Sequence, residues 1–371
     1  MSTRLAESAA LHVRVRAIVK AFERGLAAEP FDDVARDLAR FQGKYVAGYA
    51  RLCAARDIDP ASIARACEAP AVPTDAFKIA DVFAFDPRNA SFTFRTSGTT
   101  IGMRGTHSVR DMNTYDAAAL AFGRTMLVHD LTLPVPILVV GPSEEEAADS
   151  SLAHMCGLFV RAFGSRSSGE QTFFVRGGAL DLDGLRARVE QLRDEGASIV
   201  LATSFGLVHL LELLDGEVLA LPARSRVMQT GGFKGKSREV EARTLRADIA
   251  RAFAIDETDV VCEYGMTELS SQFWEATLVD SRARHGVYRE PPWARVVPVH
   301  PETLMPVDDG EIGIARIEDL ANVDSAFAVL ASDRVRRKDG GFEILGRAQG
   351  GTPRGCSIAL DEMLSRQRTS S

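Results

Sequence analysis

The sequence predicts an α/β fold, because strand-like runs alternate with helical runs through the central part of the chain. From Phe92 to about residue 290, short β-rich runs are separated by longer runs with apolar residues at three- and four-residue spacing. This alternation is typical of largely parallel sheets covered by helices. Ligands of such sheets bind at loops beyond the carboxyl ends of the strands. We therefore look for the functional residues in those loops.

The elements of this core are expected at regular intervals. The expected strands are residues 91–95, 135–140, 172–175, 199–202, 226–229 and 260–263. The expected helices between them are residues 112–128, 151–163, 185–195, 205–214 and 237–253.

The regions before and after the core have a different pattern. Residues 4–68 are expected to be helical, since apolar residues recur there at helical spacing, as in Leu11, Val15, Ile18, Val19 and Phe22. After about Pro291, short strands separated by turns are expected at residues 294–298, 313–318, 326–330 and 342–345. We therefore predict a first part over residues 1–290, a small β-rich subdomain over 291–345 and a mobile tail over 346–371.

Composition excludes several classes of protein. The formal net charge of −7 and the pI of about 5.6 argue against nucleic acid as the main partner, because phosphate backbones need a basic surface. The five cysteines form no C-x-x-C pair, which favours a reducing cytoplasm over a disulfide framework or a zinc site. We find no apolar run of the roughly 20 residues that a membrane helix needs, and no signal peptide. The oligomeric state stays open.

The strongest local signal is a loop that follows the expected strand 91–95. Its sequence is Thr96-Ser97-Gly98-Thr99-Thr100-Ile101-Gly102-Met103-Arg104-Gly105. Glycines let backbone N–H groups approach an oxyanion, and hydroxyls add further donors. Arg104 adds a fixed positive charge. The loop is suited to a polyphosphate, although composition alone favours an ordinary surface loop.

Two further clusters follow strands. Gly231 and Gly232 lie in a glycine-rich turn that fails the P-loop pattern by one residue, since Thr230 stands where its first glycine is needed. The segment Glu263-Tyr264-Gly265-Met266-Thr267-Glu268 is expected to open a helix. A carboxylate there can hold Mg²⁺, and Thr267 can donate to a phosphate. The alternative is a helix start capped by Thr267.

Four single residues are also candidates. Asp333 lies at a strand end, where its carboxylate can accept from both ribose hydroxyls or serve as a turn residue, and Gly346-Arg347 follows it. His154 lies on an expected helix, where a lone histidine is more often structural than catalytic. Cys356 lies beside Arg354, which favours the nucleophilic thiolate; otherwise it is a small apolar residue.

The order of these clusters resembles that of the adenylate-forming superfamily, which includes acyl-CoA synthetases and peptide-synthetase adenylation domains. Residues 96–105 resemble its phosphate loop T-S-G-T-T-G-x-P-K-G, with Arg104 in place of the lysine. The resemblance implies that Gly231 and Gly232 bind adenine and that Asp333 binds the ribose. Its Y-G-x-T-E motif is matched by Tyr264, Gly265, Thr267 and Glu268. Arg347 matches the G-R before its interdomain hinge. The fold implied is the large N-terminal domain of these enzymes, with layered mixed sheets and helices, plus the small β-rich subdomain.

The whole chain resembles more closely the LuxE-type acyl-protein synthetases of bacterial fatty-acid reductase complexes. The shared segments are T-G-G-[FW]-K-G at Thr230, S-S-L-x-x-M at Ser150 and R-G-C-S at Arg354. The chain is not expected to carry the roughly 100-residue C-terminal domain of the wider superfamily, only a hinge remnant and tail.

This resemblance implies an ATP-dependent ligase. ATP and a fatty acid form acyl-AMP, with Arg104 and residues 96–100 on the phosphates, Mg²⁺ on Glu268 and His154 near the carboxylate. The acyl group then moves to Cys356 and on to a partner reductase. Two alternatives remain open: a ligase that passes its acyl group to coenzyme A or a carrier protein, and a nucleotide-binding scaffold without catalysis.

Overall fold

The structure is a computed structural model that describes residues 3–96, 104–165, 171–231, 241–348 and 353–364. The chain forms two units. Unit 1 comprises Met1–Ala121, Met266–Gln272 and Arg289–Ser371, and unit 2 comprises Phe122–Gly265 and Phe273–Tyr288. The chain leaves and re-enters unit 1, so the units do not follow the linear division at residues 290 and 345. That division stays a prediction.

The N-terminal helices of unit 1 form where apolar spacing predicts them. They are α1 (Thr3–Glu23), α2 (Phe31–Tyr45), α3 (Ala47–Ala55) and the short α4 (Ala76–Ile79). On α2 the buried Gln42 side chain donates to the carbonyls of Asn322 and Val323 and accepts from Phe327 N, at 3.0–3.1 Å. These bonds satisfy a buried amide and tie α2 to the connection that precedes β14.

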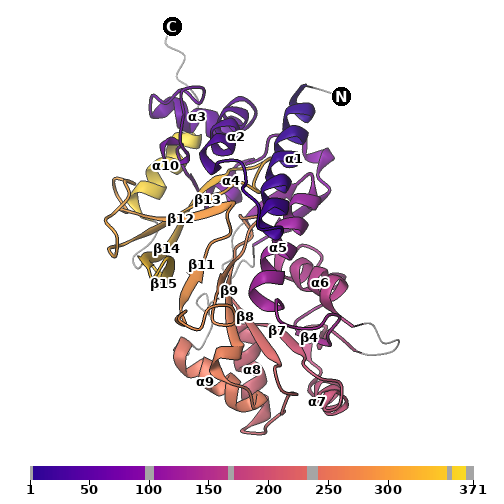
Figure 1. The fold of residues 1–371 in the computed structure, drawn as a ribbon. Coiled ribbons are helices and arrows are strands. Elements are labelled where there is room, and N and C mark those ends of the chain that lie inside the picture. Colours follow the sequence, from indigo (N-terminus) through magenta and orange to yellow (C-terminus); the bar gives the residue numbers. More distant parts are fainter. Residues whose placement is uncertain (1–2, 97–103, 166–170, 232–240, 349–352, 365–371) are drawn as a thin grey trace. The chain divides into compact units, whose positions relative to one another are not determined.

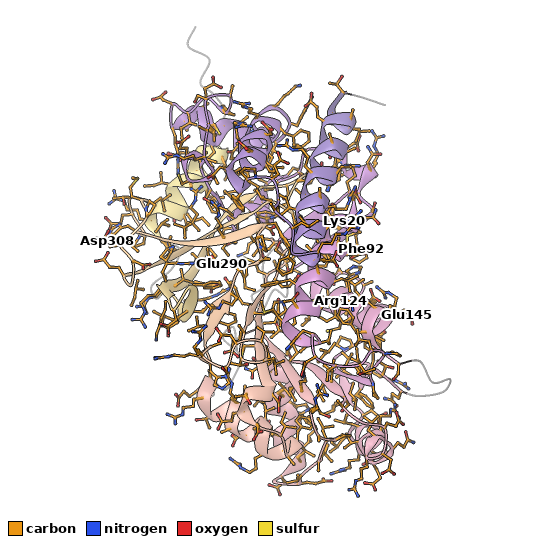
Figure 2. All side chains as sticks on the ribbon, viewed as in Figure 1. Lys20, Phe92, Arg124, Glu145, Glu290 and Asp308 are labelled. Carbon is orange, nitrogen blue, oxygen red and sulfur yellow. The ribbon has the colours of Figure 1, made fainter. Side chains whose placement is uncertain are left out.

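Unit 1 contains an antiparallel sheet of β12 (Ala294–Val299), β13 (Ile312–Asp319), β14 (Ala328–Lys338) and β15 (Gly341–Arg347), in that order. The short β1 (Val72–Pro73) pairs in parallel with β14. The four expected strands are confirmed, and β14 extends beyond its expected end. Glu290, labelled in Figure 2, accepts from Arg337 Nη1 at 2.7 Å and from Val296 N, and so joins β14 to β12.

The chain segment expected to be a mobile tail contains a helix, α10 (Arg354–Leu364). Cys356, Ala359 and Met363 recur at helical spacing and are buried, and α10 packs against α3. Arg56 Nε binds Glu362 Oε2 at 2.8 Å, and Arg51 Nε donates to the carbonyl of Met363. An apolar stripe short enough to escape notice in the sequence is thus sufficient to dock this segment.

Unit 2 is built on a sheet in the order β10-β9-β8-β7-β4, with β11 (Val287–Arg289) beside β10. The strands β4 (Ile137–Val140), β7 (Ile199–Thr203), β8 (Arg226–Thr230) and β9 (Val260–Tyr264) are parallel, and β10 (Phe273–Glu275) is antiparallel to β9. The parallel sheet and the positions of these four strands are as expected. The expected strand 172–175 is reduced to a bridge between Phe173 and Val139, followed by the hairpin of β5 (Val175–Arg176) and β6 (Ala179–Leu180).

Helices connect the parallel strands of unit 2 (Figure 1). They are α6 (Ser151–Phe163), α7 (Leu182–Leu192), α8 (Ser204–Leu214) and α9 (Ala242–Phe253), while α5 (Met112–Leu127) begins in unit 1 and ends in unit 2. Residues of α7, α8 and α9 form one core with Leu138, Val200 and Val227 of the strands. The alternate strand residues, such as Val139 and Leu201, are also buried, so the sheet is covered on both faces.

A buried ion pair fastens α9 to the strands of unit 2. Arg246 Nη2 lies 2.8 Å from Glu275 Oε1 and 2.9 Å from Glu275 Oε2, and Glu275 also accepts from Cys262 N at 2.9 Å. Both charged side chains are at most 5% exposed. None of the helices that the structure describes is long and apolar enough to span a membrane.

Candidate active site

The candidate residues are distributed over both units. Unit 1 carries Thr96, Arg104, Thr267, Glu268, Asp333, Arg347 and Cys356, and unit 2 carries His154, Gly231, Tyr264 and Gly265. Ser97, Gly98, Thr99, Thr100 and Gly232 lie outside the described residues.

The candidate phosphate loop closes a β-hairpin in unit 1. Its strands are β2 (Phe92–Arg95) and β3 (Thr106–Val109), paired in register from Phe92 with Val109 to Arg95 with Thr106. At the base of the loop, Thr96 N donates to Gly105 O and Gly105 N donates to Thr96 Oγ1, both at 2.9 Å. A Cβ on Gly105 would lie 3.1 Å from Thr96 Cγ2, so glycine allows this close approach. The hairpin therefore sets where the two ends of the loop lie.

Arg104 folds back on the hairpin. Its Nε donates to Thr96 O at 2.6 Å and its Nη2 to Arg95 O at 3.2 Å. The side chain is nevertheless exposed. The guanidinium thus lies at the loop's base with Nε and Nη2 on backbone carbonyls, and binding a phosphate would exchange such bonds for bonds to an anionic acceptor.

The segment that follows β9 is a turn, and the expected helix there is wrong. Leu269 N donates to Met266 O at 3.1 Å, which closes the turn. Ser270 N then donates to Asp319 Oδ2 at 2.8 Å, and Ser271 Oγ donates to Asp319 Oδ1 at 2.6 Å. The buried carboxylate of Asp319, at the end of β13, thus binds the Ser270 N–H that a helix would have used for its own hydrogen bond. The chain continues into β10.

Two hydrogen bonds from side chains to the carbonyls of Thr267 and Glu268 hold these residues within unit 1. His107 Nδ1 of β3 lies 2.8 Å from the Thr267 carbonyl, and Asn322 Nδ2 donates to the Glu268 carbonyl at 2.9 Å. Burial lowers the pKa of His107 to about 4, so the ring is uncharged at neutral pH. These bonds place Thr267 beside the hairpin that carries the candidate phosphate loop.

Asp333 and Arg347 are cross-strand partners on β14 and β15. Arg347 Nε lies 3.3 Å from Asp333 Oδ1, with Asp333 only 13% exposed and Arg347 65% exposed. The register shifts between Asp333 and Val335, a bulge of the kind that re-aims side chains. The two residues that the sequence separates by a strand and a turn therefore meet.

In unit 2 the candidates lie where β8 and β9 end. Gly231 follows β8 with a φ of +73°, a conformation that favours glycine, and its carbonyl accepts from Ser204 Oγ at 2.6 Å. Tyr264 ends β9, with its ring centroid 6.0 Å from those of Phe273 and Tyr288. These positions at the carboxyl ends of parallel strands are where such sheets bind ligands.

Glu263 is a buried carboxyl at the same edge. It pairs across the sheet with Thr230, whose hydroxyl donates to Glu263 Oε2. Burial raises its pKa to about 7, because this hydroxyl only partly replaces the lost water. Neither the raised pKa of Glu263 nor the contact of His107 with Thr267 can be recognised in the sequence, since both depend on partners that the fold brings together.

A cavity of about 220 Å³ lies in unit 2 at the carboxyl ends of β4 and β7. It is lined mainly by apolar groups, among them Val140, Ala153, Cys156, Ala202 and Phe205. An engineered apolar cavity of about 150 Å³ binds benzene. The unit 2 cavity therefore has room for a larger apolar group.

His154 lies on α6, next to a residue of this cavity but not among those that line it. Its Nδ1 is 3.1 Å from Glu144 Oε1, and the same carboxylate binds Arg161. The side chain is 12% exposed. In this structure His154 is thus engaged with a carboxylate of the protein.

Cys356 is buried on α10. Burial, followed by the negative charge of Asp75, raises the pKa of its thiol from the ordinary 9.0 to about 11. The thiolate that we expected beside Arg354 is therefore disfavoured while α10 is docked. The start of α10 packs closely against residues 301–304 at Gly355. The Gly355 N–H donates to Pro301 O at 2.9 Å, and a Cβ on Gly355 would lie 2.6 Å from Leu304 Cδ2.

No group of three or more His, Cys, Asp or Glu that could hold a metal ion occurs among the residues that the structure describes. Mg²⁺ bound together with a nucleotide needs fewer ligands from the protein, since phosphate oxygens and water complete its shell. Glu268, which is buried and fixed through its backbone, fits that requirement.

Comparison with known proteins identifies the family. The family model described as "Acyl-protein synthetase, LuxE" matches residues 34–365. The chain belongs to this family. A search of curated proteins found no match.

Solved structures share the fold of this LuxE-family chain. The ATP-bound MatB from Rhodopseudomonas palustris matches with a TM-score of 0.51 at 14% identity, over 71% of this chain and 49% of that one. An open conformation of 2-hydroxyisobutyryl-CoA ligase in complex with 2-HIB-AMP and CoA matches with a TM-score of 0.60 at 13% identity, over 87% and 76%. The chain thus spans about half the length of MatB. The likeness confirms the predicted adenylate-forming fold.

Proposed function

We propose that this LuxE-family chain uses ATP to convert a carboxylic acid into an acyl-adenylate and then transfers the acyl group to its own Cys356. The family match carries the proposal, because residues 34–365 contain every candidate residue of both half-reactions. The first half-reaction has further support, since one structure with the same fold is bound to ATP and another is a complex with 2-HIB-AMP and CoA.

In the first half-reaction a carboxylate oxygen attacks the α-phosphorus of ATP. The bond to the bridging oxygen breaks, and pyrophosphate leaves with the electron pair. Such a step needs positioning and charge neutralisation more than covalent help. Thr96, Arg104 and the loop between them bind the phosphates, and Thr267 donates to one of them. Mg²⁺, held by Glu268, supplies further neutralisation of the phosphate charge.

Each unit has its own candidate residues for the nucleoside. Asp333 accepts from the ribose hydroxyls, and Arg347 keeps its carboxylate in place through the 3.3 Å contact. Gly231 and Gly232 allow adenine to approach the backbone, and Tyr264 offers an aromatic face.

The acid carries an apolar chain. The support is the unit 2 cavity, whose lining from β4, α6, β7 and α8 is mainly apolar and which has room for a group larger than benzene. Burying each CH₂ of such a chain contributes about 0.8 kcal/mol, which favours a fatty acid over a short one. His154 orients the carboxylate after exchanging its contact with Glu144.

The second half-reaction uses Cys356. Its thiolate attacks the acyl carbonyl, AMP leaves with the bonding electrons, and a thioester remains on the chain. The thiol proton passes to solvent. Since the docked thiol has a raised pKa, α10 must leave its site on α3 before the attack. A partner reductase then receives the acyl group.

A transfer to coenzyme A or a carrier protein is the second candidate, motivated by the burial of Cys356. Incubation with ATP and a radiolabelled fatty acid separates the two. We expect label to stay on the wild-type chain after denaturation and to be released by hydroxylamine, and we expect Cys356→Ala to retain none while still forming acyl-AMP. If Cys356→Ala retains the label, acylation of Cys356 is wrong.

The cavity is tested by narrowing it. Ala153→Leu adds three carbons to its wall, so the preferred acid should become shorter by several carbons. Ala162→Leu, on the exposed side of the same helix, controls for the change in helix propensity and should leave the preference unchanged. An unchanged preference in Ala153→Leu would place the acyl chain elsewhere.

A further inference from the structure

The hairpin of β2 and β3 connects two parts of the candidate nucleotide site within unit 1. It carries the phosphate loop at one end, and through His107 it contacts the turn that contains Thr267 and Glu268. The cross-strand partner of His107 is Phe94, only two residues from Thr96. Any shift of His107 is therefore transmitted over a short length of paired strand to the base of the loop.

His107 is built into this position from two sides. Its side chain is 2% exposed, and its ring stands edge-on to Phe77 with centroids 5.8 Å apart. The Thr267 carbonyl can only accept, so Nδ1 must carry the proton. The bond is therefore a donor–acceptor pair between a buried side chain and a part-buried stretch of backbone.

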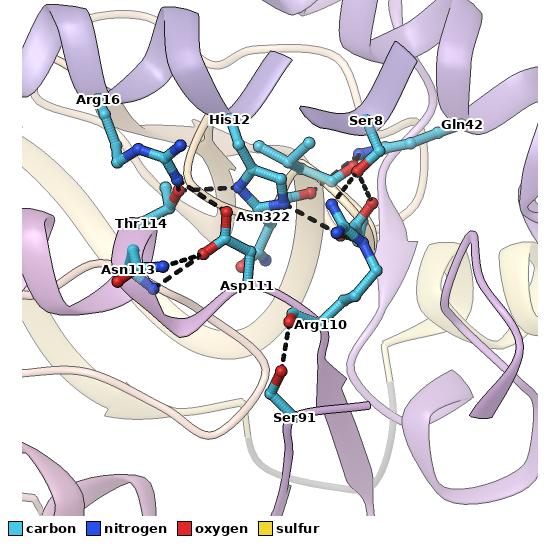
Figure 3. Close-up of polar contacts among 12 residues, drawn as sticks. Ser8, His12, Arg16, Gln42, Ser91, Arg110, Asp111, Asn113, Thr114 and Asn322 are labelled. Atoms are coloured by element: carbon cyan, nitrogen blue, oxygen red, sulfur yellow. Dashed lines mark hydrogen bonds and ion pairs between the residues drawn. The ribbon is translucent and has the colours of Figure 1, made fainter. Parts of the chain in front are cut away.

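A second buried histidine of unit 1 has a different set of partners (Figure 3). His12 of α1 contacts Thr114 Oγ1 at 2.8 Å and Asp324 Oδ2 at 3.0 Å, and Asp324 also binds Arg110 Nε at 2.9 Å. This network holds α1 against the chain that follows β3. None of these bonds involves Thr267, so His12 provides a matched comparison at 3% exposure.

We propose that His107 is a positioning residue for ATP, which holds Thr267 and Glu268 beside the β2–β3 hairpin by donating from Nδ1 to the Thr267 carbonyl. The inference rests on the proposed function, and it adds a residue that does not itself contact the nucleotide. Without the bond the turn keeps its contacts with Asn322 and Asp319 but loses its link to the hairpin, and the phosphates lose a precisely fixed site.

Three variants separate positioning from general stability. His107→Phe keeps the ring and removes the donor. His107→Asn restores a donor, because its amide nitrogen is as many bonds from Cα as Nδ1 of histidine. His12→Phe makes the same substitution at a similarly buried site of the same unit. Each variant is assayed as the full chain, per folded molecule counted by near-UV circular dichroism, for KM of MgATP, KM of the acid and kcat in pyrophosphate exchange.

We expect His107→Phe to raise KM for MgATP by about ten- to a hundredfold, the effect of orphaning one buried acceptor, with KM for the acid unchanged. His107→Asn should recover most of that loss, and His12→Phe should keep the wild-type KM despite a lower melting temperature. Equal KM values for ATP in His107→Phe and His12→Phe would overturn the proposal while leaving wild-type adenylation intact. Absence of exchange and of ATP binding in the wild type would overturn the proposal and the proposed function together.

Discussion

Gly355→Ala is predicted to release α10 and to expose Cys356. The added Cβ would lie 2.6 Å from Leu304 Cδ2 and 2.7 Å from the Pro301 carbonyl oxygen. The backbone carbonyl cannot move aside as a flexible side chain can, so the start of the helix must move away. Release of the helix brings the Cys356 thiol into water and returns its pKa from about 11 towards 9.

The size of the effect follows from the clash. Overpacking of this kind costs about 1–3 kcal/mol, and replacing glycine by alanine returns up to about 1 kcal/mol in helix propensity. With that return the net change is up to about 2 kcal/mol, which corresponds to an increase of up to about thirtyfold in the population of undocked helix. Labelling of a buried thiol follows that population when docking is fast compared with the reaction.

The assay is the rate of alkylation at each cysteine, followed by mass spectrometry at pH 7.5. Cys67 is exposed and serves as an internal standard. Ser357→Ala, next along α10, gains helix propensity without a comparable clash and should not speed the labelling of Cys356. If wild-type Cys356 reacts as fast as Cys67, or if Gly355→Ala leaves its rate unchanged, the docked helix does not control this thiol.

Three further predictions concern stability. Relative to His107→Asn, the wild type should lose up to about 3 kcal/mol of unfolding free energy as pH falls from 6.5 to 4, because His107 takes up a proton in the unfolded chain but stays neutral when buried. Urea titrations across this pH range measure the difference in unfolding free energy between the two proteins. A difference that does not change with pH would refute this prediction. For Glu263 the pH dependence of stability has the opposite sign, since the pKa of Glu263 is raised to about 7. The wild type should lose about 3 kcal/mol of unfolding free energy relative to Glu263→Gln as pH rises from 4.5 past 7. Equal pH profiles of the two proteins would exclude the raised pKa. Arg246→Ala should cost about 3–5 kcal/mol by removing the arginine that pairs with the buried charge of Glu275, and a melting temperature within a few degrees of the wild type would contradict the ion pair as described.

Much of the fold can be predicted from local sequence, because burying one face of a helix or strand requires apolar residues at a regular spacing. The helix of residues 151–163 was located to the residue, since its apolar stripe and the Ser150 cap coincide. The parallel strands of unit 2 stand out as apolar runs, as expected of a sheet buried on both faces. The order of the glycine and hydroxyl clusters predicts the adenylate-forming superfamily. The three segments at Ser150, Thr230 and Arg354 predict the LuxE family, which the family model matches.

What could not be predicted depends on contacts between distant parts of the chain. No local pattern reveals that Asp319 captures Ser270 N and prevents a helix after Tyr264. The docked α10 binds Arg51 of α3 and Arg56 just after it, some 300 residues away, and the contact between His107 and Thr267 spans 160 residues. Positioning residues of this kind become visible only once the fold has brought their partners together.

ATP–pyrophosphate exchange with a graded panel of carboxylic acids tests the central claim most directly. Wild-type chain, MgATP and labelled pyrophosphate should give labelled ATP only when an acid is added, with the highest rate for acids that carry an apolar chain. Cys356→Ala should give the same rates, because exchange needs only the first half-reaction. Measurable ATP binding without exchange for any acid would contradict adenylation and favour a nucleotide-binding scaffold.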